Sequence, residues 1–196
     1  DNMRAGLLDR AETLFTDLVA MDALAPVALN HLVAIYQHER DWNKAIDIAR
    51  KLEAATGESQ GASIAQFYCE LAEQARSRKA WAEARGFLDE ACAAEGDCVR
   101  ASMILGHIEA SNGNPDAAIA AFEHVAERDV DYVPEILSPL LDVYAKAQRM
   151  QRAEEFLLRM TERHQGVSPV LALARLYSRT KGEKSAVDFL TRQLHQ

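Results

Sequence analysis

The side chains that could carry out chemistry are six histidines, three cysteines and scattered carboxylates. His31 and His38 are seven residues apart, which places them on roughly the same face of a helix, but a zinc site needs further ligands. Cys92 and Cys98 flank a turn at 95–97 and could form a redox pair, although inert thiols are the simpler interpretation. Neither pair by itself makes a reactive centre.

Other motifs of reaction chemistry are missing from the sequence. There is no glycine-rich phosphate loop, no His-Glu-x-x-His pair and no Gly-x-Ser-x-Gly nucleophile turn. Asp129 and Asp131 lie in a turn where they could cap a helix, and no second pair of carboxylates accompanies them for acid–base work. The sequence therefore predicts a protein that is not an enzyme and binds no cofactor.

The composition predicts which elements must hold these side chains. The 196 residues are rich in alanine and include only 9 glycines and 5 prolines, which favours helices and leaves little material for strands and turns. A net charge of −8 disfavours nucleic acid as a partner. No uninterrupted apolar run is long enough for a membrane span, so no direct membrane insertion is expected.

An internal repeat sets the predicted architecture. A register alanine recurs at Ala11, Ala45, Ala84, Ala118, Ala153 and Ala186. The spacings are 34, 39, 34, 35 and 33 residues, close to the period of the tetratricopeptide repeat, which the chain resembles. We therefore predict an all-α tetratricopeptide-repeat α-solenoid, a right-handed superhelix of helix hairpins.

The same register divides the chain into repeats. The predicted segments are a partial repeat over 1–25 (the second helix of a pair), a repeat over 26–64, repeats over 65–98, 99–133 and 134–166, and a truncated repeat over 167–196, all in one continuous solenoid. The stretch 57–63 is predicted to be a longer connecting loop, and the alternative is that it changes the superhelical pitch. Pro139 predicts a helix that begins late or is kinked.

The better functional candidates face the inner surface of such a solenoid. They are polar residues of both signs with one methionine, which suits a protein or peptide partner better than a small apolar ligand. The predicted partner-binding residues are Asn30, Gln37, His38, Gln66, Glu73, Arg76, Arg100, Met103, His107, Asp142, Lys146 and Arg175.

A closer resemblance is carried by four stretches of sequence. They are Ala5–Glu12, Trp42–Ala49, Ile64–Ala72 and Thr191–Leu194, which match in order and spacing the LapB (YciM) family of bacterial lipopolysaccharide assembly proteins. The resemblance runs along the whole chain. Gln66 departs from the family pattern, which has histidine at that position, so no imidazole role is carried over.

The resemblance implies a noncatalytic adaptor in Gram-negative bacteria that regulates lipopolysaccharide synthesis. Such proteins have a membrane anchor, a cytoplasmic repeat array and a rubredoxin-like module for zinc or iron. They recruit the LpxC deacetylase to the FtsH membrane protease for degradation, and the inner-membrane regulator LapC (YejM) opposes them. The implied location is the cytoplasmic face of the inner membrane.

The chain departs from this family pattern at both ends. It begins without an anchor, and no cysteine follows Cys98, so the metal module is expected outside this fragment. Uncapped apolar ends of a repeat array could pair with another copy, which makes a homo-oligomer possible. The alternative is an unrelated tetratricopeptide scaffold in a secretion or envelope assembly complex.

Overall fold

Every regular element in the described residues is helical. The computed structural model describes residues 2–19, 25–164 and 166–194. The helices are α1 (Asn2–Val19), α2 (Ala25–Glu39), α3 (Trp42–Thr56), α4 (Gly61–Ser77), α5 (Trp81–Ala94), α6 (Val99–Ser111), α7 (Pro115–Arg128), α8 (Val133–Lys146), α9 (Met150–Arg163), α10 (Val167–Lys181) and α11 (Glu183–Leu194), with a short 3-10 turn, η2 (Val130–Tyr132), before α8. The prediction of an all-α fold is confirmed.

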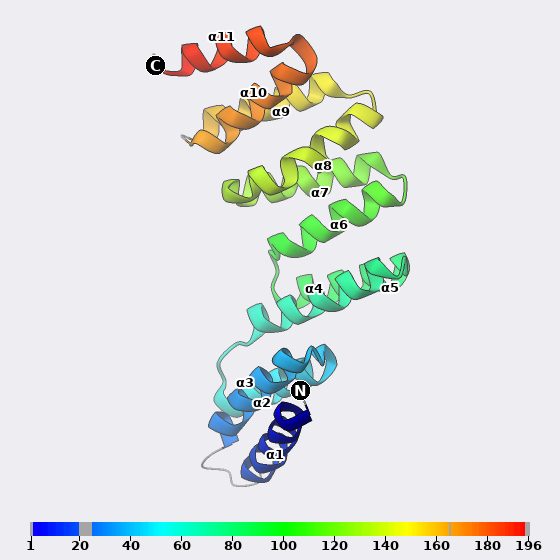
Figure 1. Ribbon diagram of the computed structural model, residues 1–196, viewed down its shortest axis with the longest axis vertical. Helices are drawn as coiled ribbons and strands as arrows, with labels where there is room; N and C mark the ends of the chain where they lie inside the picture. The colour runs from blue at the N-terminus through cyan, green and yellow to red at the C-terminus, as the bar shows by residue number, and fades with distance from the viewer. Residues whose placement is uncertain (1, 20–24, 165, 195–196) are drawn as a thin grey trace. The chain divides into compact units, whose positions relative to one another are not determined.

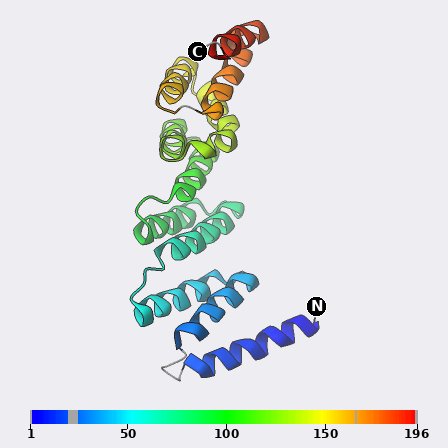
Figure 2. The same ribbon diagram turned by 90° about the vertical axis from the view of Figure 1, so that its left-hand side faces the viewer.

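The chain forms two compact units, residues 1–98 and residues 99–196. In the first unit α2 pairs with α3 and α4 with α5, and α3 packs on α4 so that the hairpins stack (Figure 1). In the second unit the hairpins are α6–α7, α8–α9 and α10–α11, joined by packing of α7 on α8 and of α9 on α10. The view in Figure 2 shows how the two helices of a hairpin run in opposite directions. The boundary between the two units follows Cys98.

The register alanines mark the close contacts within the hairpins. Ala45, Ala84, Ala118 and Ala153 are fully buried. Gly106 shows the same demand for a small residue in α6, because a Cβ atom added there would lie 2.6 Å from a ring carbon of Phe122 in α7. The alanine excess in the composition is therefore partly a packing requirement.

Each unit has its own apolar core. In the first, aromatic rings of α3 and α4 meet where Trp42 stacks on Phe67, with ring centroids 5.9 Å apart. In the second, the largest fully buried side chains include Phe122, Tyr144 and Phe156. Burial of these faces between stacked helices supplies most of the driving force for the fold.

Each hairpin turn contains one residue in the left-handed backbone region. These residues are Arg40, Lys79, Gly113, Gln148 and Gly182, with φ between 57° and 86°. Glycine adopts this conformation without a steric cost, whereas the other three residues carry a Cβ atom that disfavours it. A positive φ thus recurs in the hairpin turns even where glycine does not.

The structure differs from the predicted loop at 57–63. Only 57–60 separate α3 from α4, and α4 begins at Gly61, so it crosses the predicted repeat boundary between 64 and 65. Ser59 Oγ accepts a hydrogen bond from the Gly61 amide, and a Cβ atom on Gly61 would lie 2.5 Å from the Ala94 carbonyl oxygen. The added residues therefore lengthen α4, whose first turn packs closely on the end of α5.

Pro139 lies within α8, which already begins at Val133. The late start considered from the sequence is therefore excluded. Pro134 stands in the first turn of the same helix, where its missing amide proton costs little.

Candidate functional site

The predicted partner-binding residues of the first unit lie on α2 and α4. Asn30, Gln37 and His38 on α2 and Gln66 on α4 are exposed. On α4, Arg76 Nε donates a hydrogen bond to Glu73 at 2.7 Å, so these two residues are joined as an ion pair. Among the six predicted residues of this unit, the structure thus joins Glu73 and Arg76.

The predicted residues of the second unit fall into two environments. Met103 and His107 on α6 are half-buried, and the His107 ring packs edge-on against Phe122 with centroids 5.1 Å apart. Arg100 on the same helix is also half-buried. By contrast, Asp142, Lys146 and Arg175 on α8 and α10 are exposed.

A pocket of about 280 Å³ opens between α8 and α10. Its lining residues, which define the α8–α10 pocket, are Leu137, Ser138, Leu141, Arg175, Ser178 and Arg179. The two leucines come from the buried side of α8, whereas the serines and arginines are exposed. The pocket therefore combines an apolar floor with a polar, cationic rim.

The two guanidinium groups of this pocket differ in their partners. Arg179 Nη2 lies 3.0 Å from a carboxylate oxygen of Asp142 on α8, which neutralises its charge. Arg175 makes no ion pair or hydrogen bond with any residue in the described part of the chain. A carboxylate entering the pocket would thus meet one uncompensated positive charge.

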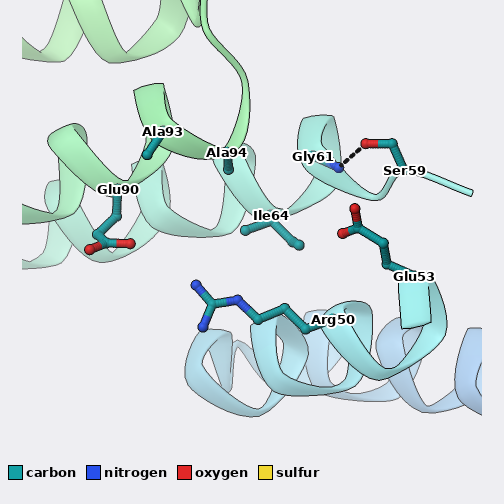
Figure 3. Close-up of a pocket in the computed structure, with 8 residues that line it drawn as sticks. All are labelled: Arg50, Glu53, Ser59, Gly61, Ile64, Glu90, Ala93 and Ala94. Carbon is teal, nitrogen blue, oxygen red and sulfur yellow. Dashed lines mark hydrogen bonds between the residues drawn. The ribbon is translucent and has the colours of Figure 1, made fainter. Parts of the chain in front are cut away.

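A second pocket, of about 290 Å³, lies in the first unit among α3, α4 and α5 (Figure 3). Glu53, Glu90 and Arg50 line it together with the first residues of α4. Arg50 donates a hydrogen bond to the Tyr68 hydroxyl at 2.9 Å. This pocket is more polar than the α8–α10 pocket and carries charges of both signs.

Three tyrosines, each on the first helix of a hairpin, donate hydrogen bonds to carboxylates on the preceding helix of the chain. The pairs are Tyr36 with Glu12, Tyr144 with Glu123, and Tyr177 with Glu154. A cation also approaches each carboxylate, at 3.9 Å for Lys44, 2.8 Å for Arg152 and 2.6 Å for Lys181, respectively. These triads connect successive hairpins within a unit.

The electrostatics of the triads point to a structural role. Burial and the hydrogen bond to a carboxylate raise the pKa of Tyr36, Tyr144 and Tyr177 above the usual value for tyrosine. The Lys181 ammonium lowers the pKa of the Glu154 carboxyl. The hydroxyls therefore stay protonated donors at neutral pH and cannot serve as nucleophiles.

The cysteines are arranged differently from the spacing in the sequence. Cys98 Sγ lies 3.8 Å from Cys69 Sγ, 29 positions away in the sequence, and both thiols are buried. Cys92 is exposed, yet partial burial raises the pKa of its thiol. Its low thiolate content does not suit redox catalysis.

His31 and His38, which the sequence places on one face of a helix, are both exposed on α2. His31 stacks on Phe15 with centroids 4.7 Å apart. Within residues 2–19, 25–164 and 166–194, no three histidine, cysteine or carboxylate side chains gather as metal ligands.

Two further sequence interpretations can be checked. Asp129 caps η2, because its carboxylate accepts a hydrogen bond from the Asp131 amide at 3.0 Å, as the turn composition predicted. Arg179 and the serines of the α8–α10 pocket are not among the residues predicted from the sequence. The available signal was the four-residue spacing of Arg175 and Arg179, which places both on one face of α10.

Comparison with known proteins gives relatives for the whole chain. No family model matches it. It is 34% identical over 194 residues to lipopolysaccharide assembly protein B of Haemophilus influenzae, covering 99% of this chain and 49% of that protein. It is 33% identical over 196 residues to lipopolysaccharide assembly protein B of Escherichia coli K12, covering 100% of this chain and 50% of that protein. The chain thus spans about half the length of the curated relatives it matches.

A solved structure supports the fold. The chain resembles YrrB, described as a TPR protein with an unusual peptide-binding site, with a TM-score of 0.50 and 14% identity over 90% of this chain and 89% of that one. The predicted tetratricopeptide fold is confirmed. In the described ranges, no helix has both the length and the apolar character needed to cross a bilayer.

Proposed function

The chain belongs to the lipopolysaccharide assembly protein B family, and we propose that it is the protein-binding array of a noncatalytic adaptor. It matches about half the length of those relatives. The adaptor regulates lipopolysaccharide synthesis by bringing the LpxC deacetylase to the FtsH membrane protease for degradation. It works at the cytoplasmic face of the inner membrane, where the regulator LapC (YejM) opposes it.

The observation that carries this proposal is the similarity along the entire chain combined with a tetratricopeptide fold. Stacked helix hairpins present exposed side chains from successive inner helices, and such surfaces suit extended or folded protein partners. The exposed polar residues of α2, α8 and α10 provide this surface within each unit.

The chemistry of the described residues supports a binding role over a catalytic one. The tyrosine hydroxyls with raised pKa values lie in structural contacts with carboxylates. The two pockets described above are open, and neither contains a nucleophile paired with a base. Affinity would then come from shape and charge complementarity.

The direct test measures binding of the 196-residue chain to purified LpxC and to the cytoplasmic domain of FtsH by isothermal titration calorimetry. We expect binding to at least one of them. The circular dichroism spectrum of the same sample establishes that the chain is folded. A folded chain that binds neither protein would contradict the recruiting role of this array.

A cellular test complements the binding measurement. Deleting the segment equivalent to 1–196 from the full-length protein should raise the steady-state level of LpxC and lengthen its half-life. An unchanged LpxC half-life in cells that express the deletion variant stably would argue against the adaptor mechanism.

A further inference from the structure

We propose that the α8–α10 pocket binds a short acidic segment of a partner protein, in which an aliphatic side chain enters the pocket and a neighbouring carboxylate pairs with Arg175. This inference rests on the protein-binding role proposed above and specifies the chemistry of the bound segment. The carboxylate can belong to an aspartate or glutamate side chain or to a chain terminus.

The size and floor of the pocket indicate one side chain as the occupant. Leu137 and Leu141 are 4% and 2% exposed and form an apolar surface at the base. A volume of about 280 Å³ lies just below the range of about 300–1,000 Å³ that is typical of small-molecule sites. An aliphatic side chain with its flanking backbone fits such a space, and its burial against leucines provides affinity.

The charge of the rim selects an acidic neighbour. Since Asp142 already neutralises Arg179, the unpaired positive charge belongs to Arg175. A guanidinium binds a carboxylate through two parallel hydrogen bonds, which adds orientation as well as energy. The serine hydroxyls of Ser138 and Ser178 can bind the backbone of the same segment.

Exposed apolar side chains on α10 continue the proposed binding surface beyond the pocket. Val167 and Leu171 are 71% and 49% exposed, and they precede Arg175 at intervals of four residues along the same face. Exposed aliphatic side chains in this series favour a partner with further apolar residues beside its acidic group. A nucleic-acid backbone is disfavoured, because it requires several cations in a row and Arg175 supplies one.

A peptide array tests the inference. Immobilised random peptides of about 12 residues, each with either a free or an amidated C-terminus, are probed with the folded 196-residue chain. We expect bound peptides to be enriched in an aliphatic residue within two positions of an aspartate, a glutamate or a free terminal carboxylate. The amidated set shows which of these carboxylates is used.

Variants of the chain locate the binding to this pocket. Fluorescence polarisation with the best array peptide should show Arg175→Glu weakening the affinity by about tenfold or more, because attraction becomes repulsion. Arg175→Lys should retain part of the affinity. Arg163→Glu is the matched control, since Arg163 is exposed on α9 outside the pocket, and its effect should stay within about twofold.

The outcomes separate this inference from the proposed function. If Arg175→Glu and Arg163→Glu bind the peptide equally well, or if the array shows no preference for acidic and aliphatic residues, the assignment of the pocket is overturned even where the chain still binds LpxC or FtsH. If the chain binds neither protein but selects such peptides through Arg175, the pocket assignment stands and the LpxC–FtsH role fails. Preferential binding of single-stranded nucleic acid or inorganic phosphate at Arg175 would also overturn the assignment of the pocket to an acidic peptide segment.

Discussion

The hydrogen bond between Tyr144 and Glu123 offers a sensitive test of how successive hairpins are held together. Tyr144 on α8 is fully buried, and its hydroxyl donates to the Glu123 carboxylate on α7. Arg152 Nη2 also lies 2.8 Å from that carboxylate. Tyr144→Phe therefore removes one donor while the ring and the ion pair stay in place.

The magnitude follows from these partners. A hydrogen bond to a charged group contributes about 1.5–3 kcal/mol to stability. The lower part of this range applies, because Arg152 continues to satisfy the carboxylate and phenylalanine leaves no cavity of significant size. We expect Tyr144→Phe to lower the free energy of unfolding by about 1.5–2 kcal/mol, which corresponds to about 3–8 °C in Tm for a chain of this size.

Urea unfolding followed by circular dichroism measures this loss. Tyr132→Phe is the matched control, because the Tyr132 hydroxyl makes no hydrogen bond to any described residue, and its effect should stay within about 0.5 kcal/mol. A double-mutant cycle with Glu123→Gln isolates the coupling between the two side chains. Equal stabilities for Tyr144→Phe and Tyr132→Phe would refute the view that this contact stabilises the stack.

Four other outcomes can be checked on the same protein. Gly106→Ala should cost about 1–3 kcal/mol in urea unfolding, since its Cβ would lie 2.6 Å from a buried ring, and a neutral result would mean that the α6–α7 contact can relax. Gln148→Gly should add about 0.5–1 kcal/mol by relieving its left-handed backbone, and a lower Tm would contradict this. Maleimide should label exposed Cys92 well before the two buried thiols, and mass spectrometry of digested samples would show any other order. Lys181 lowers the pKa of Glu154, so the stability from this pair is fully present above the unfolded-state pKa of about 4.3 and is lost as the pH falls through the lower folded-state pKa. Glu154→Gln should therefore be more destabilising at pH 6 than at pH 3, and an equal effect at both pH values would disprove the linkage.

The hairpin architecture could be predicted from the sequence because it depends on local spacing. Ala118 and Phe122 are four residues apart, so they share a helix face, and both are fully buried as that spacing requires. Gly106 stands at the corresponding small position of the preceding helix and contacts Phe122. Such one-dimensional regularity is sufficient to identify stacked repeats.

The start of α4 could not be predicted in the same way. Gly57, Ser59 and Gly61 have the composition of a turn, which led to the predicted loop. In the structure, contact of Gly61 with the end of α5 favours a helical first turn that its intrinsic propensity disfavours. Tertiary packing therefore decided the local conformation.

The α8–α10 pocket could be predicted only in part. Arg175 and Asp142 follow from the predicted repeat register. The pairing of Asp142 with Arg179, 37 residues away in sequence, depends on the offset between α8 and α10. The contact between Cys69 and Cys98 likewise depends on how a loop returns to a helix. Distances between elements of this kind are not encoded in spacing along one helix.

The left-handed turn residues have a consequence for how such an array can grow. Arg40, Lys79, Gly113 and Gln148 each stand five residues before a register alanine. The one enlarged repeat instead takes its additional residues into the first turn of α4, next to the joint with the preceding hairpin. An insertion inside a hairpin turn would change this five-residue spacing, which brings each alanine to its buried contact with the first helix. Length changes are therefore tolerated at the joints between modules, and 57–60 or 129–132 are the places where a foreign hairpin could be spliced into the chain.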